Sequence, residues 1–130
     1  MNAASDLTFA APGLAARLAE LSSEQLDRLD FGVIGFGADT NVSRYNLTES
    51  DAAGLTPAHV LGQPLFTGVA PCLNNFMVAQ RFEDARDSRA ALDDTIDYVL
   101  TLRMRPVKVT LRLLAEAGGA LRYVLVQRKP

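Results

Sequence analysis

The chain has 130 residues, a formal net charge of -2, 48% hydrophobic and 22% charged residues, a composition that suits one globular domain. The slightly acidic balance argues against nucleic-acid binding, which requires a basic surface. One cysteine and one histidine exclude an internal disulfide, a cysteine-cluster metal site and a histidine-rich one. No apolar run is long enough to cross a bilayer and no signal-peptide pattern opens the chain, so we expect a cytoplasmic protein without membrane contact.

The first 30 residues are expected to form a tail and a short helical cap. Residues 1–13 are mostly small or polar and contain a Pro-Gly breaker, which indicates a loose tail. Residues 14–21 place leucines on one helical face. Residues 22–29 begin with a serine and carry a glutamine three positions later, the pattern of a capping box. Both helices are too short to be stable alone, so we expect them to cap a main body formed by residues 31–130.

The main body begins with a predicted β-hairpin. Residues 31–36 are apolar and include aromatic and β-branched side chains, residues 37–41 are of turn-forming types, and residues 42–46 resume a strand pattern. Two short helices are then predicted over 47–53 and 57–61, because each is followed by a glycine and the second begins at a proline.

The middle of the chain predicts a break and then a longer helix. Residues 63–75 show no periodicity and should form a loop or a broken helix. Asn75 is placed to cap a helix over 76–89, whose apolar side chains recur on one stripe.

The last third predicts three strands. Apolar and polar residues alternate over 95–104 and 107–114, and a final strand follows over 121–129, which indicates a sheet with one buried face. Strands at both ends of a helical middle predict an α+β fold, with about five antiparallel strands covered on one face by a helical crossover. This arrangement encloses a pocket and resembles the plan of a PAS domain, a sensor and interaction module.

The single cysteine, Cys72, ends the stretch VAPC. Taken alone, this cysteine could be a small buried residue of the core, a nucleophile or an attachment point. A nucleophilic thiol needs a base nearby, and His59, the only imidazole, lies in a short helix with no motif that joins it to Cys72. A thiol enzyme is therefore disfavoured. A phosphate-binding loop is disfavoured too, because GFGADT (35–40) lacks the required glycine spacing before a helix.

Tyr45 and Glu49 lie four positions apart, where a strand gives way to a helical turn. This spacing can bring a phenol and a carboxyl group to the same side. In isolation the pair reads as a tyrosine at the core edge and a solvated glutamate. The alternative is a pair of hydrogen-bond donors to a buried anion, with Glu49 kept neutral because burial raises the pKa of a carboxyl group.

Several stretches together resemble the photoactive yellow protein family of blue-light receptors. They are YNLTES (45–50), FTGVAPCLNN (66–75), RFEDA (81–85) and RMRPVKV (103–109), and LSSEQLDRLDFGVIGF (21–36) is similar to the family's N-terminal cap and first strand. The similarity runs in register from about Leu21 to Lys129, with a shift of one residue between Cys72 and Met104.

The resemblance implies a 4-hydroxycinnamoyl (p-coumaroyl) chromophore, bound as a thioester to Cys72 and buried as a phenolate. Tyr45 and Glu49 match the residues that hydrogen-bond the phenolate. The other matches are pocket-lining positions and the methionine that helps the chromophore return to its dark state: Ile34, Ala70, Pro71 and Met104.

The pocket departs from the family pattern at five positions. Ala53 stands where a threonine supports the tyrosine, and Leu55 stands where an arginine shields the ring from water. Aromatic residues that pack around the chromophore are replaced at Leu65, Leu100 and Leu102. The lost arginine removes a fixed positive charge, and Arg103 and Arg105 are the candidates to replace it in part.

The function implied by the resemblance is a blue-light photoreceptor, not an enzyme. Light isomerises the chromophore from trans to cis, and Glu49 gives a proton to the phenolate. The buried carboxylate that remains is costly, so the N-terminal cap is partly released as the signal. We expect an unidentified downstream signalling protein and a monomer or weak homodimer. The alternative is a chromophore-free PAS-type module that binds another ligand or a partner protein.

Overall fold

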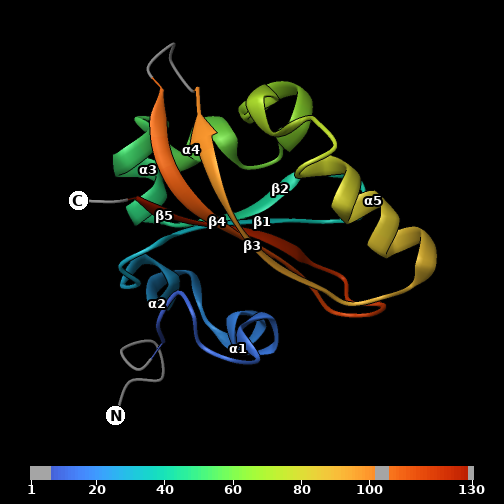
Figure 1. The fold of residues 1–130 in the computed structure, drawn as a ribbon. Coiled ribbons are helices and arrows are strands. Elements are labelled where there is room, and N and C mark those ends of the chain that lie inside the picture. The colour runs from blue at the N-terminus through green and yellow to red at the C-terminus, as the bar shows by residue number, and fades with distance from the viewer. Residues whose placement is uncertain (1–6, 102–105, 129–130) are drawn as a thin grey trace.

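The computed structural model describes residues 7–101 and 106–128. Five strands form one antiparallel sheet in the order β2-β1-β5-β4-β3, with helices on both faces (Figure 1). The strands are β1 (Gly32–Phe36), β2 (Val42–Tyr45), β3 (Leu92–Leu100), β4 (Val107–Ala115) and β5 (Arg122–Arg128). The predicted α+β fold with an antiparallel sheet and a helical crossover is therefore confirmed.

The first two strands form the predicted hairpin. Its turn includes Thr40 at a φ of 67°, and β1 pairs with β2 in an antiparallel register that sets Ile34 opposite Tyr45. Two residues that the sequence assigned to the ligand pocket are thus neighbours on adjacent strands.

Between β2 and β3 the chain crosses one face of the sheet as a series of short helices. They are α3 (Leu47–Ala53), α4 (Pro57–Val60), the π-helical turn η2 (Leu65–Val69), the 3₁₀ turn η3 (Pro71–Leu73) and α5 (Ala79–Ser88). The two short helices and the broken segment were predicted. The longer helix begins at Ala79 rather than at position 76. Asn75 Oδ1 does accept hydrogen bonds from the N–H groups of Met77 and Val78, but the N–H of Gln80 bonds the Asn75 carbonyl five positions back, so residues 76–78 form a wider turn before the helix.

The larger hydrophobic core lies between the sheet and this crossover. Phe36 of β1 meets Phe66 and Phe82 edge to face, with ring centroids 5.5 and 5.0 Å apart, a favourable aromatic geometry. Alternate residues of β4 and β5 complete this core cluster: Val109, Leu111, Leu113, Val124 and Val126. The packing fixes η2, η3 and the start of α5 over the sheet.

The opposite face of the sheet is covered as well, so the expectation of a single buried face was wrong. Helices α1 (Leu14–Glu20) and α2 (Ser23–Asp27) lie on this face, with the predicted capping box at the start of α2 (Figure 1). They pack, with the residues that flank them, on β1, β4 and β5 in a second core cluster that includes Leu14, Leu18, Leu26, Phe31, Val33, Leu114 and Leu125. All five residues of β1 are buried, because helices cover both of its sides.

The segment just before α1 is ordered against the sheet, which corrects the predicted loose tail over residues 7–13. Leu7 and Phe9 are 6% and 7% exposed, and the ring of Phe9 meets that of Phe31 edge to face at 5.9 Å. Both belong to the second core cluster. The N-terminal cap therefore includes this segment as well as α1 and α2, while the division of the chain at residue 30 stays a prediction.

Candidate functional site

Tyr45 and Cys72 face the same apolar region. Tyr45 ends β2 and is 8% exposed, and it belongs to the first core cluster. Cys72 lies in η3, is half-buried and packs against that cluster. Most of the predicted pocket residues lie in or against the same cluster: Ile34, Leu55, Leu65, Ala70 and Leu100. The thiol of Cys72 and the phenol of Tyr45, 27 positions apart in the sequence, are thus brought to one hydrophobic interior.

The remaining predicted positions are placed differently. Ala53 is buried at the end of α3, whereas Pro71 is exposed at the start of η3. Leu102 and Met104 lie outside the described residues, as do Arg103 and Arg105. Their predicted roles stay predictions.

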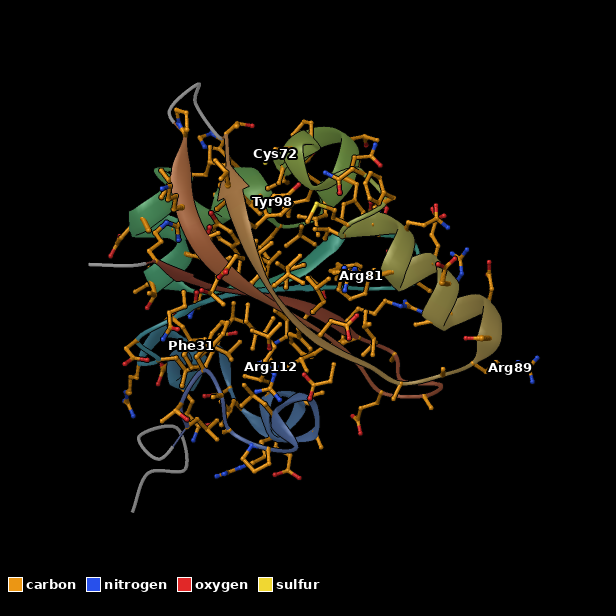
Figure 2. The ribbon with its side chains drawn as sticks, viewed as in Figure 1. Phe31, Cys72, Arg81, Arg89, Tyr98 and Arg112 are labelled. Atoms are coloured by element: carbon orange, nitrogen blue, oxygen red, sulfur yellow. The ribbon has the colours of Figure 1, made fainter. Side chains whose placement is uncertain are left out.

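Two side chains fix the backbone at Cys72. The Tyr98 hydroxyl, on β3, donates a hydrogen bond to the carbonyl oxygen of Cys72. The Asn75 amide donates to the same oxygen at 3.2 Å and to the Tyr98 hydroxyl at 2.6 Å. Cys72 and Tyr98 lie close together on the α5 side of the sheet (Figure 2). Sequence reasoning missed Tyr98 as a site residue. The sequence does hold one indication of its role: Tyr98 lies on the predicted buried face of its strand, where a tyrosine hydroxyl needs a hydrogen-bond partner.

An open groove runs along β3 beside this network. It has a volume of about 560 Å³ and is lined by Met77, Asp97, Tyr98, Val99, Lys108 and Val109. Pockets of several hundred Å³ suit small organic ligands. The groove therefore adjoins the residue that positions Cys72.

Glu49 is buried in α3 and is held by an arginine from the last strand. It is 1% exposed, and Arg128 donates through Nη1 to Oε1 at 2.7 Å and through Nη2 to Oε2 at 3.1 Å. A forked pair of this kind is among the strongest side-chain hydrogen-bond geometries. Burial raises the pKa of Glu49, and the hydrogen bond and charge of Arg128 act against that rise. No sequence motif links Arg128 to a residue 79 positions away, so sequence reasoning missed it.

Tyr45 lies close enough to Glu49 for the two groups to interact electrostatically. Burial, and then the charge of Glu49, raise the pKa of the Tyr45 phenol, while Arg128 lowers it. The hydroxyl is therefore protonated at neutral pH and able to donate. Within residues 7–101 and 106–128, no hydrogen bond joins it to the Glu49 carboxylate, whose partner is Arg128.

Gly32 of β1 leaves the space that the Glu49 carboxylate occupies. A Cβ atom at this position would lie 2.1 Å from Glu49 Oε1, closer than any real contact. Gly32 is paired with Val126 of β5, two residues before Arg128. Strands β1 and β5 therefore provide, respectively, the room for the carboxylate and the cation that binds it.

Asn46 joins Glu49 to the N-terminal cap. It is fully buried, and its Oδ1 accepts hydrogen bonds from the N–H groups of Val33 at 2.9 Å and Glu49 at 3.1 Å. Its amide donates to the carbonyl oxygens of Leu26 at 2.9 Å and Phe31 at 3.0 Å. One side chain thus caps α3 and ties it to α2 and to the start of β1.

The groups considered for enzyme chemistry lie elsewhere. His59 is exposed on α4 and is hydrogen-bonded to Thr56 through Nδ1 at 2.9 Å. The described part of the chain holds no cluster of three or more His, Cys, Asp or Glu residues suited to a metal ion. Nor does any helix in those same residues have the length and apolar character needed to span a membrane.

No protein-family model matches the chain, but its fold is similar to solved structures. The PAS domain of the RpfR quorum-sensing receptor from Cronobacter turicensis has a TM-score of 0.60 at 12% identity, covering 79% of this chain and 97% of that one. The five-stranded antiparallel sheet with its helical crossover is therefore a PAS fold.

Two further similarities define the family within that class. The photoactive yellow protein domain of the sensor histidine kinase Ppr from Rhodospirillum centenum has a TM-score of 0.79 at 31% identity, covering 87% of this chain and 98% of that domain. The photoactive yellow protein of Halochromatium salexigens is 30% identical over 105 residues, covering 81% of this chain and 83% of that protein. The chain belongs to the photoactive yellow protein family.

Proposed function

We propose that the protein is a blue-light photoreceptor that carries a 4-hydroxycinnamoyl (p-coumaroyl) group as a thioester on Cys72. The observation that carries this proposal is the convergence of Cys72 and Tyr45 on one apolar cluster, in a chain of the photoactive yellow protein family. Because the sequence contains one cysteine, no other thiol competes for the attachment.

The residues of the site fit such a group. Its ring requires an apolar enclosure, which Ile34, Leu65 and Leu100 provide. Its phenolate requires hydrogen-bond donors, and the raised pKa of Tyr45 keeps that hydroxyl protonated. Its thioester requires a thiol that an activated acyl donor can reach, and Cys72 is half-buried rather than sealed in the core.

When bound, the group supplies a double bond that light isomerises from trans to cis. The protein's part is to manage one proton and one negative charge. With the chromophore bound, Tyr45 and protonated Glu49 would donate to its phenolate in the dark, and Glu49 would give up its proton after isomerisation. The charge would then reside on a carboxylate that is 1% exposed, where an ion is costly to bury even when it is paired.

The response passes from α3 to the N-terminal cap. Asn46 binds both the Glu49 backbone and the carbonyl oxygens of Leu26 and Phe31. A shift of α3 would therefore strain the hydrogen bonds that join Asn46 to α2. We propose partial release of the cap as the signal, an order–disorder switch, read by a downstream signalling protein. The photoreceptor itself acts as a monomer or weak homodimer.

Reconstitution tests this proposal. The protein is incubated with activated p-coumaric acid, and intact mass and the visible spectrum are recorded before and after blue light. We expect a mass increase of one p-coumaroyl group and a visible band that bleaches in light and returns in the dark. Cys72→Ala should stay unmodified. A wild-type protein that remains unmodified and colourless refutes the proposal.

The role of Glu49 is tested in the loaded protein by Glu49→Gln. An amide is a weaker hydrogen-bond donor than a carboxylic acid, so the phenolate should absorb at longer wavelength. A band at the wild-type position would show that Glu49 does not contact the phenolate.

One observation favours the alternative of a chromophore-free PAS-type module. Arg128 already binds both carboxylate oxygens of Glu49, so Glu49 has a partner without any chromophore. This alternative predicts a colourless protein after reconstitution and binding of an uncharged small molecule or a partner protein.

A further inference from the structure

The buried carboxylate of Glu49 is matched to one cation. Arg128 binds both oxygens, while its own side chain is 23% exposed against 2% for Glu49. The guanidinium therefore reaches into the protein from the surface and stays partly hydrated. This arrangement lowers the cost of burying the pair, because only one of the two ions loses its water fully.

Within residues 7–101 and 106–128, few other groups face this carboxylate. Strand β2 contributes the Tyr45 phenol, and β1 contributes only backbone, at Gly32, where a side chain would clash with Oε1. Asp27 of α2 contacts α3, where its carboxylate accepts a hydrogen bond from the N–H of Leu47 at 2.8 Å. Among the described residues, Arg128 is thus the group of opposite charge bound to Glu49.

The positive charge at this site comes from a different element than the family resemblance implies. Leu55 occupies the position where the family resemblance implies an arginine, and it packs as an apolar residue against the core. Arg128 comes instead from the end of β5, where it pairs with Val109 of β4. The positive charge is therefore directed at Glu49 itself.

We propose that Arg128 is the counter-ion of Glu49 in the photocycle, a positioning residue that stabilises the carboxylate once its proton has moved to the chromophore phenolate. This inference rests on the proposed photoreceptor function. In that step the O–H bond of Glu49 breaks, an O–H bond forms on the phenolate oxygen, and the electron pair stays on Glu49. The net charge of phenolate, Glu49 and Arg128 is unchanged, and the negative charge ends beside the guanidinium.

The first test uses the chain without chromophore, so that it is independent of the photocycle. The titration of Glu49 is followed by NMR of ¹³C-labelled carboxyl groups and assigned with Glu49→Gln. In Arg128→Gln the pKa of Glu49 should rise by about one unit or more, because a nearby opposite charge commonly shifts a carboxyl pKa by that amount. Arg128→Lys should give a smaller rise, and Arg122→Gln, at the other end of β5, should give none. An unchanged titration in Arg128→Gln overturns the proposal.

The second test uses the reconstituted protein. We expect the light-adapted form of Arg128→Gln to return to the dark form about tenfold faster than the wild type, equivalent to a loss of about 1.4 kcal/mol of light-state stabilisation. The double variant Glu49→Gln/Arg128→Gln should recover at the rate of Glu49→Gln alone, because no carboxylate remains to stabilise. Equal recovery of Arg128→Gln and the wild type overturns the inference. If no variant takes up the chromophore, the photoreceptor proposal fails, while the titration still decides whether Arg128 holds Glu49.

Discussion

The guanidinium of Arg112, on β4, donates a hydrogen bond to the carbonyl oxygen of Phe9 at 2.9 Å, across 103 positions of sequence. The same side chain donates to the carbonyl of Ala11 at 2.8 Å and pairs with Asp93 at 2.8 Å. Arg112 points toward the N-terminal side of the sheet, on the same side as Phe31 (Figure 2). A buried arginine therefore fastens the segment that the proposed signal must release.

Replacing Arg112 should loosen this segment without unfolding the sheet. Arg112→Ala removes two hydrogen bonds from a charged donor to backbone carbonyls, and we expect a loss of about 2 kcal/mol in the free energy of unfolding. Hydrogen exchange of residues 7–20 should accelerate more than that of β4 and β5. Urea unfolding and exchange measured by mass spectrometry test both expectations.

Arg81→Ala is the matched control for that change. Arg81 also pairs with an aspartate, Asp94, at 2.9 Å, but both side chains are more than a third exposed, and such surface pairs contribute about 1 kcal/mol or less. It should leave exchange in residues 7–20 unchanged. Equal acceleration in the two variants would contradict a specific role for Arg112.

Asn46→Ala should destabilise the protein more than any of the surface changes. The substitution removes the cap of α3 and leaves buried backbone groups of Leu26, Phe31 and Val33 without their partner. A cap contributes about 1 kcal/mol and an unsatisfied buried group about 1–3 kcal/mol. We therefore expect the free energy of unfolding, measured by urea denaturation, to fall by about 3 kcal/mol. Exposed Asn74→Ala should cost less than about 0.5 kcal/mol. Similar losses for the two asparagines would count against the proposed link between α3 and the cap.

Local signals were sufficient to predict much of this fold. The capping box of Ser22 and Gln25, the glycine at position 54 after α3 and the proline that begins α4 each determine a boundary through backbone chemistry. The same holds for the alternation of β4, which specifies a strand face. Tyr45, Glu49 and Cys72 were found because their spacing resembles a known family.

The contacts that sequence reasoning missed join distant segments. Arg112 reads as a polar residue on the solvent side of β4, yet the segment around Phe9 folds over that side and buries it. Arg128 reads as one more charge near the chain end, but the sheet order sets β5 beside β1 and under α3. No local sequence pattern indicates either contact, because each depends on how distant segments are arranged around the sheet.

Gly32→Ala should act through Glu49. The new Cβ would lie 2.1 Å from Oε1 and 3.1 Å from the Cβ of Glu49, so the carboxylate must move, at a cost of about 1–3 kcal/mol for overpacking. The cost should shrink by about 1 kcal/mol in a Glu49→Ala background, because Oε1 is gone. Gly68→Ala, whose nearest neighbour atom would be 3.5 Å away, serves as the control. If the costs of Gly32→Ala and Glu49→Ala were simply additive in a double-mutant cycle, the new Cβ would not be clashing with the Glu49 carboxylate.

The pH dependence of stability should carry the signature of Glu49. Its pKa is raised in the folded protein above the ordinary value of 4.5, so in that range the folded state binds more protons than the unfolded state. The free energy of unfolding should therefore fall as the pH rises from 4.5 through the folded pKa. Glu49→Gln should lack this fall, and Arg128→Gln should extend it to higher pH. If the free energy of unfolding varied with pH in the same way in the wild type and in Glu49→Gln, the fall could not be assigned to Glu49.

Tyr98→Phe should make the Cys72 thiol more reactive. The change keeps the ring but removes the hydroxyl that donates to the Cys72 carbonyl and accepts from Asn75, so the backbone of η3 gains freedom. We expect reaction with a chromogenic thiol reagent to be several-fold faster, since a local opening that is easier by about 1 kcal/mol is about fivefold more frequent. Tyr123→Phe is the control, because its hydroxyl contacts Arg44 on the cap side of the sheet. If the two variants react at the wild-type rate, Tyr98 does not hold the attachment residue in place.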